Sequence, residues 1–396
     1  MKTKKLIFFA VFFILVGSFT FSLNLHSPTW GFSLDLPVDY RFIDGNGRSR
    51  FSFENPQGAR FDLIVYYASP GGVMPYASVE ALALDVEASL NNSGYMYSFV
   101  YRGKNAVLLE LSFTLPGTGP VAGWALAIEL GNDSPGAIQA GAGSAEVPRP
   151  LLLALAYGPA WQFDLYVLHI SALDSIAPEQ RDLLAPGPIT EFTFPRENRI
   201  RAPIFGLDLE AWIYEEDAEA AQALVDREFQ VLRRFADAQN WQDAWIRFYR
   251  AIHRDSFDRL TDIAFQIERK LNVPAREKRD FAEQVLFWVQ SFEYERDFLG
   301  SDFFNAITAA TEGRGDCDSR AMLWAVVLQQ AGIPAAMMVS RHFGHAMGLA
   351  ELPGTGARFE VEGRSFLVAE TTANVSIGLI EESVSVIDYW LGILFD

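Results

Sequence analysis

The spacing of hydrophobic and polar residues changes near the middle of the chain. Before residue 195, short apolar or alternating runs broken by glycine, proline and asparagine predict strands at 31–37, 50–54, 61–67, 106–113, 124–130, 151–157 and 163–170. Two helices interrupt them, one at 78–90 with Ser78 as its expected N-cap and a shorter one near 178–184. This pattern predicts an α+β domain built on an antiparallel sheet over residues 27–194, with a hairpin turn at 55–58.

The second half of the chain has a helical period. A charged segment with two prolines at 195–204 predicts a linker. Apolar residues then recur every three or four positions, which predicts helices whose aromatic stripes we expect to lie in the core, at 207–238, 241–271 (with a break near 255–256) and 275–292. Another helix and a meander of strands come next, at 317–330, 334–340, 345–352, 358–361 and 365–370. We expect one domain over residues 205–396, in which a helical lead-in precedes a helix packed on an antiparallel sheet.

The amino terminus has the pattern of an export signal. Three lysines precede an unbroken apolar run at 6–16, and the apolar character continues more weakly to residue 23. Thr20 and Ser22 place small residues correctly for a cut after Ser22, so residues 1–22 are predicted to be a signal peptide. Left uncut, the stretch is just long enough to anchor the protein in a membrane. The sequence therefore predicts an exported protein, periplasmic or extracellular.

Composition excludes several classes of protein. The chain has 396 residues, 50% of them hydrophobic and 21% charged, which predicts a folded protein of two to three domains rather than a disordered or fibrous one. A net charge of −18 leaves no basic surface for binding phosphate backbones, so we expect no nucleic-acid partner. A single cysteine excludes an internal disulfide and a multi-thiolate zinc site.

That cysteine, Cys317, is the strongest candidate for chemistry. Glycines at 313 and 315 and the capping residue Asp316 precede it, and an apolar helix comes after it. Free N–H groups and the positive end of the helix dipole stabilise a thiolate in the first turn, and the same N–H groups can hold an oxyanion. Asp316 and Asp318 oppose a low cysteine pKa because negative charge disfavours the thiolate.

A thiolate nucleophile needs an imidazole that takes and returns a proton. His345 begins one predicted strand and Glu370 ends another, and strands joined in this meander can set the two side chains next to each other. A metal site that combined these groups with His342 is disfavoured, because residues three apart on an extended strand face opposite ways. We expect no metal and no cofactor, with His342 at the rim of the cleft.

The order of these motifs resembles the transglutaminase-like (papain-like thiol) superfamily over roughly residues 287–372 and the preceding helices. The motifs that carry the resemblance are Gly315-Asp316-Cys317, Gly332-Ile333-Pro334, His345-Ala346 and Glu370-Thr371-Thr372. It implies that Cys317 is the nucleophile, His345 the general base and acid, and Glu370 the acid that orients the imidazole. It also makes Gln290 or Trp288 a candidate second oxyanion donor, with core packing favoured for Trp288. The family has Asp-Pro-Thr at the position of Glu370-Thr371-Thr372, so a glutamate there requires more widely separated strand ends.

The resemblance implies attack of a Cys317 thiolate on an amide of a protein or peptide, through a thioester. Water as the acceptor would make the protein a cysteine peptidase or amidase, which we favour because water is the default acceptor. A primary amine as the acceptor would make it a transglutaminase. The alternative from another class is a catalytically inactive scaffold that binds a partner in the cell envelope. Oligomeric state is left open.

Overall fold

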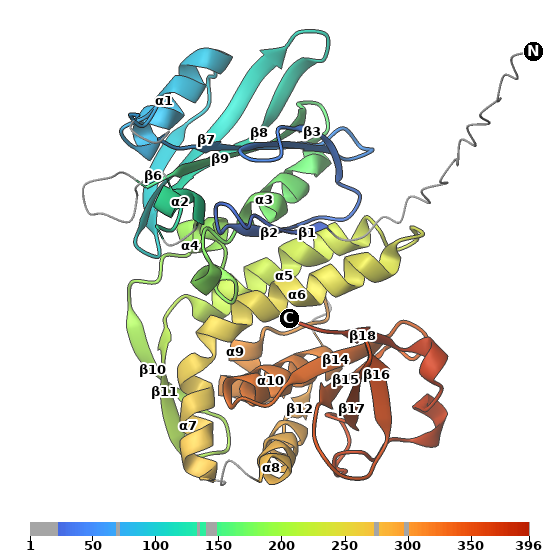
Figure 1. Ribbon diagram of the computed structural model, residues 1–396. Coiled ribbons are helices and arrows are strands. Elements are labelled where there is room, and N and C mark those ends of the chain that lie inside the picture. Colours follow the sequence, from blue (N-terminus) through green and yellow to red (C-terminus); the bar gives the residue numbers. More distant parts are fainter. Residues whose placement is uncertain are drawn as a thin grey trace, which may run out of the picture.

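The computed structural model describes residues 23–68, 72–132, 135–139, 149–272, 277–296 and 301–395. The predicted signal at 1–22 lies outside the described residues. Helices and antiparallel sheets make up most of the fold, which confirms the α+β class (Figure 1). In the described part of the chain, no helix combines the length and apolarity that crossing a membrane requires.

The first half of the chain builds a seven-stranded antiparallel sheet. In spatial order its strands are β3 (Arg41–Gly45), β4 (Arg50–Glu54), β5 (Arg60–Tyr66), β9 (Leu151–Pro159), β8 (Gly119–Glu129), β7 (Lys104–Leu115) and β6 (Met96–Tyr101). Asn55 closes the predicted hairpin turn between β4 and β5, where its side-chain oxygen accepts from the backbone N–H groups of Gln57 and Ala59. A separate antiparallel pair, β1 (Leu23–His26) and β2 (Ser33–Leu36), begins the described chain.

Helices cover both faces of this sheet. Helix α1 (Val79–Leu90) buries Leu82 and Val86 against the outer face, and Ser78 caps it by accepting from the N–H of Ala81, as predicted. Helix α3 (Tyr166–Asp174) packs on the opposite face, against β8 and β9. The prediction of a strand at 163–170 is therefore wrong, because this short run forms a 3₁₀ turn and the start of α3 with only one side buried, and periodicity in so short a run cannot separate strand from helix. The remaining short elements of this half are α2 (Pro135–Gln139), α4 (Pro188–Thr193) and the 3₁₀ turns η1 (Phe163–Leu165) and η2 (Gln180–Asp182).

Residues 199–204 of the segment predicted to be a linker form β10 (Arg199–Ile204), which pairs in a hairpin with β11 (Leu209–Tyr214). The prediction of a helix from residue 207 is wrong at its start, since α5 (Asp217–Arg233) begins only after this hairpin. Gly206 and Asp208 both have positive φ angles, which form the tight turn between the strands. Within β11, Ala211 and Ile213 are buried, and the residues beside them are exposed or half-buried, which is the period of a strand.

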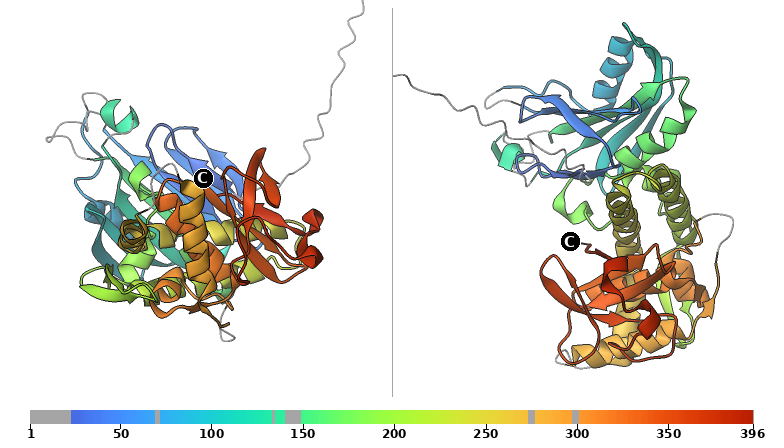
Figure 2. Two further views of the ribbon diagram at one scale, coloured as in Figure 1. Left: turned by 90° about the horizontal axis from the view of Figure 1, so that it is seen from below. Right: turned by 90° about the vertical axis from the view of Figure 1, so that its right-hand side faces the viewer.

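Helices α5 and α6 (Trp241–Arg259) lie side by side between the two sheets (Figure 2). The predicted break in the next helical segment falls at Leu260, between α6 and α7 (Thr261–Leu271), rather than near 255–256. Arg247 of α6 is buried and donates to Glu228 of α5 at 2.6 Å and to Ser171 of α3 at 2.7 Å. One continuous hydrophobic core extends from Trp30 to Ile393 across this junction.

The C-terminal sheet has five antiparallel strands with α10 (Cys317–Gln330) packed on one face. In spatial order they are β16 (Arg358–Val361), β17 (Arg364–Ala369), β15 (His345–Ala350), β14 (Ala335–Ser340) and β18 (Leu391–Ile393). The meander from β14 to β17 confirms the predicted strands, and β18 is an addition. Other elements of this half are α8 (Lys278–Gln290), β12 (Glu293–Tyr294), α9 (Ala306–Glu312), β13 (Arg314–Gly315), η3 (Glu382–Val384) and η4 (Ile387–Tyr389).

Candidate functional site

Cys317 is the first residue of α10, as the sequence predicts. The side chain of Asp316 caps the helix by accepting from the backbone N–H of Ser319 at 2.9 Å and from its hydroxyl at 2.6 Å. Gly315 before them has a φ of +156°, and a Cβ there would lie 2.7 Å from the Ser319 side chain. Glycine is therefore required for the chain to enter this helix so tightly.

The lead-in to the helix is held by a buried arginine. Arg320 donates to the backbone carbonyls of Gly315 at 3.1 Å and Phe292 at 2.8 Å. These bonds join the strand pair β12–β13 to the first turn of α10. Arg320 therefore acts as a structural clamp that fixes the position of the cysteine.

The environment of the thiol favours its protonated form. Burial raises the pKa of Cys317, whose side chain and backbone together are only 2% exposed, and the carboxylates of Asp318 and Asp316 raise this pKa further. Cys317 Sγ lies 3.6 Å from Asp318 Oδ2, within hydrogen-bond distance for a thiol. Burial also raises the pKa of Asp316, and the neighbouring Asp318 adds to that shift. The helix dipole is thus outweighed here by burial and by two acids.

One group on the sheet favours the thiolate instead. The backbone N–H of Ala346 hydrogen-bonds to the sulfur of Cys317 and lowers its pKa. Ala346 is the second residue of β15, the strand that carries His345 and on which α10 packs.

The structure brings His345 and Glu370 together. In the antiparallel pair of β15 and β17, Gly348 lies opposite Ala369. Glu370, one residue beyond this pair, lies on the same face of the sheet as His345 and diagonal to it. His345 Nε2 lies 2.8 Å from Glu370 Oε2. The longer glutamate reaches the imidazole directly.

Glu370 is held in place from its other side. Its Oε1 accepts from the backbone N–H of Thr372 at 2.8 Å and from the Thr372 hydroxyl at 2.6 Å. Burial alone would raise the pKa of Glu370, but the hydrogen bonds from His345 and Thr372 outweigh burial and hold this pKa below its ordinary value. A carboxylate that is ionised and fixed in this way can orient an imidazole.

The thiol and the imidazole are not paired in this structure. Among the hydrogen bonds of the described residues, none joins Cys317 Sγ to the His345 ring, and the sulfur contacts Asp318 and Ala346 instead. The same Asp318 accepts a hydrogen bond from the hydroxyl of Tyr249 on α6. Sequence reasoning missed Tyr249, because it lies in an aromatic stripe of α6 that is typical of an ordinary core.

The two candidate oxyanion donors have their N–H groups engaged elsewhere. Gln290 Nε2 donates to the carbonyls of Glu370 and Val375, each at 2.8 Å, which uses both amide hydrogens. The indole N–H of Trp288 donates to the carbonyl of Phe205 at 2.8 Å. Gln290 thus tethers the chain on either side of Thr372, through the carbonyls of Glu370 and Val375. The groups beside the sulfur that could still stabilise an oxyanion are the backbone N–H groups in the first turn of α10.

Metal-ligand atoms also gather at the start of α10. Single ligand atoms of Asp316, Cys317 and Asp318 all lie within 4.8 Å of one another. Each of the two carboxylates already accepts a hydrogen bond, from Ser319 and Tyr249 respectively. These three residues offer one ligand atom each. A calcium ion takes six to eight oxygen ligands, so most of its ligands would have to come from elsewhere.

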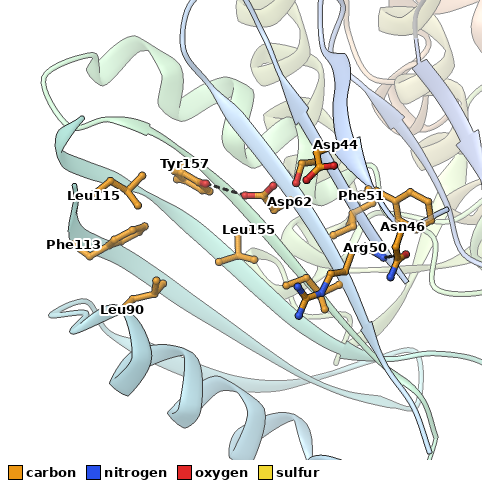
Figure 3. A pocket seen from close by; sticks show the side chains of 14 residues that line it. Asp44, Asn46, Arg50, Phe51, Asp62, Leu90, Phe113, Leu115, Leu155 and Tyr157 are labelled. Carbon is orange, nitrogen blue, oxygen red and sulfur yellow. Dashed lines mark hydrogen bonds between the residues drawn. The ribbon is translucent and has the colours of Figure 1, made fainter. Parts of the chain in front are cut away.

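A separate hollow lies on the outer face of the seven-stranded sheet and has a volume of about 520 Å³. Figure 3 shows polar side chains such as Asp62 and Arg50 toward one side and apolar ones such as Leu90 and Phe113 toward the other. The hydroxyl of Tyr157 donates to Asp62 at 2.8 Å. Neither cysteine nor histidine is among the described residues that line it, so this hollow offers no nucleophile and base for the chemistry expected at Cys317.

Comparisons with known proteins give only weak likenesses. No protein-family model matches the chain, and no curated protein matches it. Among solved structures, a candidate cysteine protease from Cytophaga hutchinsonii is 12% identical over 89% of this chain and 88% of its own, with a TM-score of 0.22. LapG from Legionella pneumophila is 14% identical over 41% of this chain and 77% of its own, with a TM-score of 0.21. CyanoP, a cyanobacterial PsbP protein from Synechocystis, is 15% identical over 41% of this chain and 95% of its own, with a TM-score of 0.28. Likenesses this low carry no argument, so the function of this chain has to be inferred from its own residues.

Proposed function

We propose that this protein is a transglutaminase-like thiol hydrolase that cleaves amide bonds through a thioester on Cys317, as a peptidase or amidase. The observation that carries the proposal is the 2.8 Å contact between His345 and Glu370, an ionised carboxylate that Thr372 also holds. His345 begins the strand whose second residue lies at the Cys317 sulfur. A carboxylate, an imidazole and a thiol at a helix start are the three parts that such a reaction needs.

In the proposed reaction His345 removes the proton from Cys317, and the sulfur attacks the amide carbonyl carbon. The backbone N–H groups of the first turn of α10 hold the oxyanion that forms. The C–N bond then breaks, and the amine leaves with the proton from His345, which generates a thioester. A water molecule, deprotonated by His345, attacks the thioester, and the carboxylic acid and the free thiol are released. Glu370 stays ionised throughout and stabilises the charged imidazole.

The resting geometry sets a condition on this reaction. The thiol is protonated and directed toward Asp318, so the imidazole has to come within hydrogen-bond distance of the sulfur before attack. We propose that bound substrate excludes water and favours this pairing, a change that catalytic hydrogen bonds commonly undergo when a complex forms.

A test uses p-nitrophenyl acetate as the acyl donor and intact mass to detect the acetyl group on Cys317. We expect acetylation of Cys317 with release of nitrophenolate in the wild type. Cys317→Ala should show neither. His345→Ala should slow acylation about 10²- to 10⁴-fold, which is the usual contribution of a general base. His26→Ala, in the first domain, is the matched control and should react like the wild type. A rate that does not depend on His345 would contradict the proposal.

A second candidate is a scaffold that binds a partner without turnover. The burial of Cys317 and the acids that raise its pKa favour this candidate. In that case the folded protein should not react with p-nitrophenyl acetate, and Cys317 should become acylated only after denaturation. The same experiment therefore separates the two candidates.

We propose further that the protein is exported and that residues 1–22 direct export. Three lysines followed by an apolar run support this, and a cut after Ser22 would leave Leu23, the first residue of β1, intact. N-terminal sequencing of the protein from cell fractions tests it: a chain that begins at Leu23 in the soluble exported fraction indicates cleavage. An intact terminus in the membrane fraction indicates an anchor, and protein confined to the cytoplasm contradicts export.

A further inference from the structure

A second hollow, of about 290 Å³, lies beside the candidate site. Four of its lining residues carry aromatic rings: Trp241 from α6, His342 from the turn after β14, and Tyr389 and Trp390 from the segment before β18. Its volume lies just below the range for small-molecule pockets, about 300–1,000 Å³, and it suits one large side chain rather than a whole cofactor. The sequence places His342 at a cleft rim, and this hollow is where it lies.

One wall of this aromatic hollow leads to the imidazole. The ring of Trp390 lies 6.1 Å from the ring of His345, edge to face. Tyr389 stacks on His342 with the ring centroids 4.0 Å apart and the planes inclined by 14°. Trp390, one of the residues that line the hollow, is therefore next to the group proposed to act as base.

The other wall leads to the thiol along α6. Trp241, Trp245 and Tyr249 are spaced four residues apart, with ring centroids 5.8 Å and 6.3 Å apart. The hydroxyl of Tyr249 donates to Asp318, whose other carboxylate oxygen contacts Cys317. The row of aromatic side chains from the hollow thus ends at Asp318, the residue that contacts the sulfur.

Two charged side chains, Arg341 and Asp388, line the hollow beside its rings. Arg341 donates to the carbonyl of Ala236 at 2.7 Å and contacts Asp237 at 3.4 Å, so its charge is already partnered. Tyr389, which stacks on His342, is 47% exposed. Aromatic rings in this arrangement bind another aromatic ring by offset or edge contacts, each of which adds to simple burial.

We propose that the aromatic hollow is a substrate subsite that binds an aromatic side chain of a peptide, next to the amide that Cys317 attacks. This inference rests on the proposed function, because a substrate subsite selects a residue type only if the protein is the proposed enzyme. Binding itself does not require turnover, so it can be measured in a protein that cannot react.

The experiment uses full-length protein carrying Cys317→Ala and monitors N-acetyl-para-fluorophenylalaninamide by ¹⁹F NMR. We expect weak, saturable binding that N-acetyltyrosinamide displaces and N-acetylleucinamide does not. Adding Tyr389→Ala should weaken binding about threefold to tenfold, the worth of one aromatic pair. Tyr95→Ala, an exposed tyrosine of the first domain, is the matched control and should bind like the parent.

Three results would overturn the subsite: no saturable binding, equal displacement by the leucine and tyrosine amides, or no change on adding Tyr389→Ala. A second variant, His342→Ala, removes the ring that stacks on Tyr389 and should weaken binding in the same direction. If the aromatic amides bind as expected but acylation of Cys317 does not depend on His345, the binding site stands and the proposed function is wrong. Normal acylation without aromatic binding would do the reverse.

Discussion

Replacing Asp318 with asparagine should convert a protonated thiol into a more reactive one. The carboxylate of Asp318 lies 3.6 Å from Cys317 Sγ and raises the pKa of the cysteine, whereas the backbone N–H of Ala346 lowers it. Asparagine keeps the oxygen that accepts from Tyr249, so the substitution removes a charge and leaves the local hydrogen bond in place.

The size of the effect depends on the distance. Two unit charges at 3.6 Å and an effective dielectric of about 20 interact by roughly 4.6 kcal/mol, which equals about three pKa units. Asp318 is partly exposed, so solvent screening reduces the shift to about one or two units. At neutral pH this raises the thiolate fraction about 10- to 100-fold, and the lower nucleophilicity of a more acidic thiol offsets part of the gain in rate.

The assay is the rate of alkylation by iodoacetamide as a function of pH, together with the ultraviolet absorbance of the thiolate. Absorbance reports ionisation whether or not the reagent can reach the buried sulfur. Glu293→Gln removes an exposed carboxylate from β12 and is the control for a change in net charge alone. If Asp318→Asn leaves the titration of Cys317 unchanged while Glu293→Gln behaves like the wild type, the electrostatic account of this thiol is refuted.

Three other substitutions each test a single residue. Glu370→Gln should lower the rate of p-nitrophenyl acetate turnover about 10²- to 10⁴-fold without unfolding the protein, because His345 loses its anionic partner; a wild-type rate would remove Glu370 from the site. Burial lowers the pKa of His169 from 6.5 to about 4. Between pH 6.5 and pH 4, His169 therefore takes up a proton in the unfolded chain but not in the folded chain. Stability should therefore fall by about 3 kcal/mol as the pH drops from 6.5 to 4, and denaturant titrations of His169→Gln should lack that component; parallel pH profiles would contradict this. Gly348→Ala would place a Cβ 2.5 Å from the Trp324 ring, and it should lower the free energy of unfolding by about 1–3 kcal/mol in urea, whereas an unchanged midpoint would show that α10 shifts freely on the sheet.

Local rules explain why much of the C-terminal part could be predicted. A glycine at 315, the cap at Asp316 and the apolar run after it specify a helix that begins at Cys317, because these interactions join residues within one turn. The next apolar runs are joined by short turns, and consecutive strands in a meander are neighbours. His345 and Glu370 could therefore be paired from the sequence, although their chemical roles stay a prediction.

Local rules failed where two structures share one pattern. The apolar run at 163–170 fits a buried strand or a buried helix equally well, and packing of α3 on the sheet decided for the helix. The predicted helix from residue 207 includes residues 209–214, although the turn at Gly206 and Asp208 pairs them with β10. In both places, contacts with other strands and helices overrode the local preference.

By itself, the sequence determined the α+β class, the start of α10 at Cys317 and the strands that carry His345 and Glu370. Only the tertiary structure decided the state of the thiol: it buries Cys317, brings Tyr249 to Asp318 and places Trp390 beside His345. The physical reason is that caps and strand periods act between near neighbours, whereas the pKa of a buried group depends on every element that covers it. Helix α6 precedes Cys317 by more than fifty residues, and its contribution could not be predicted from the chain alone.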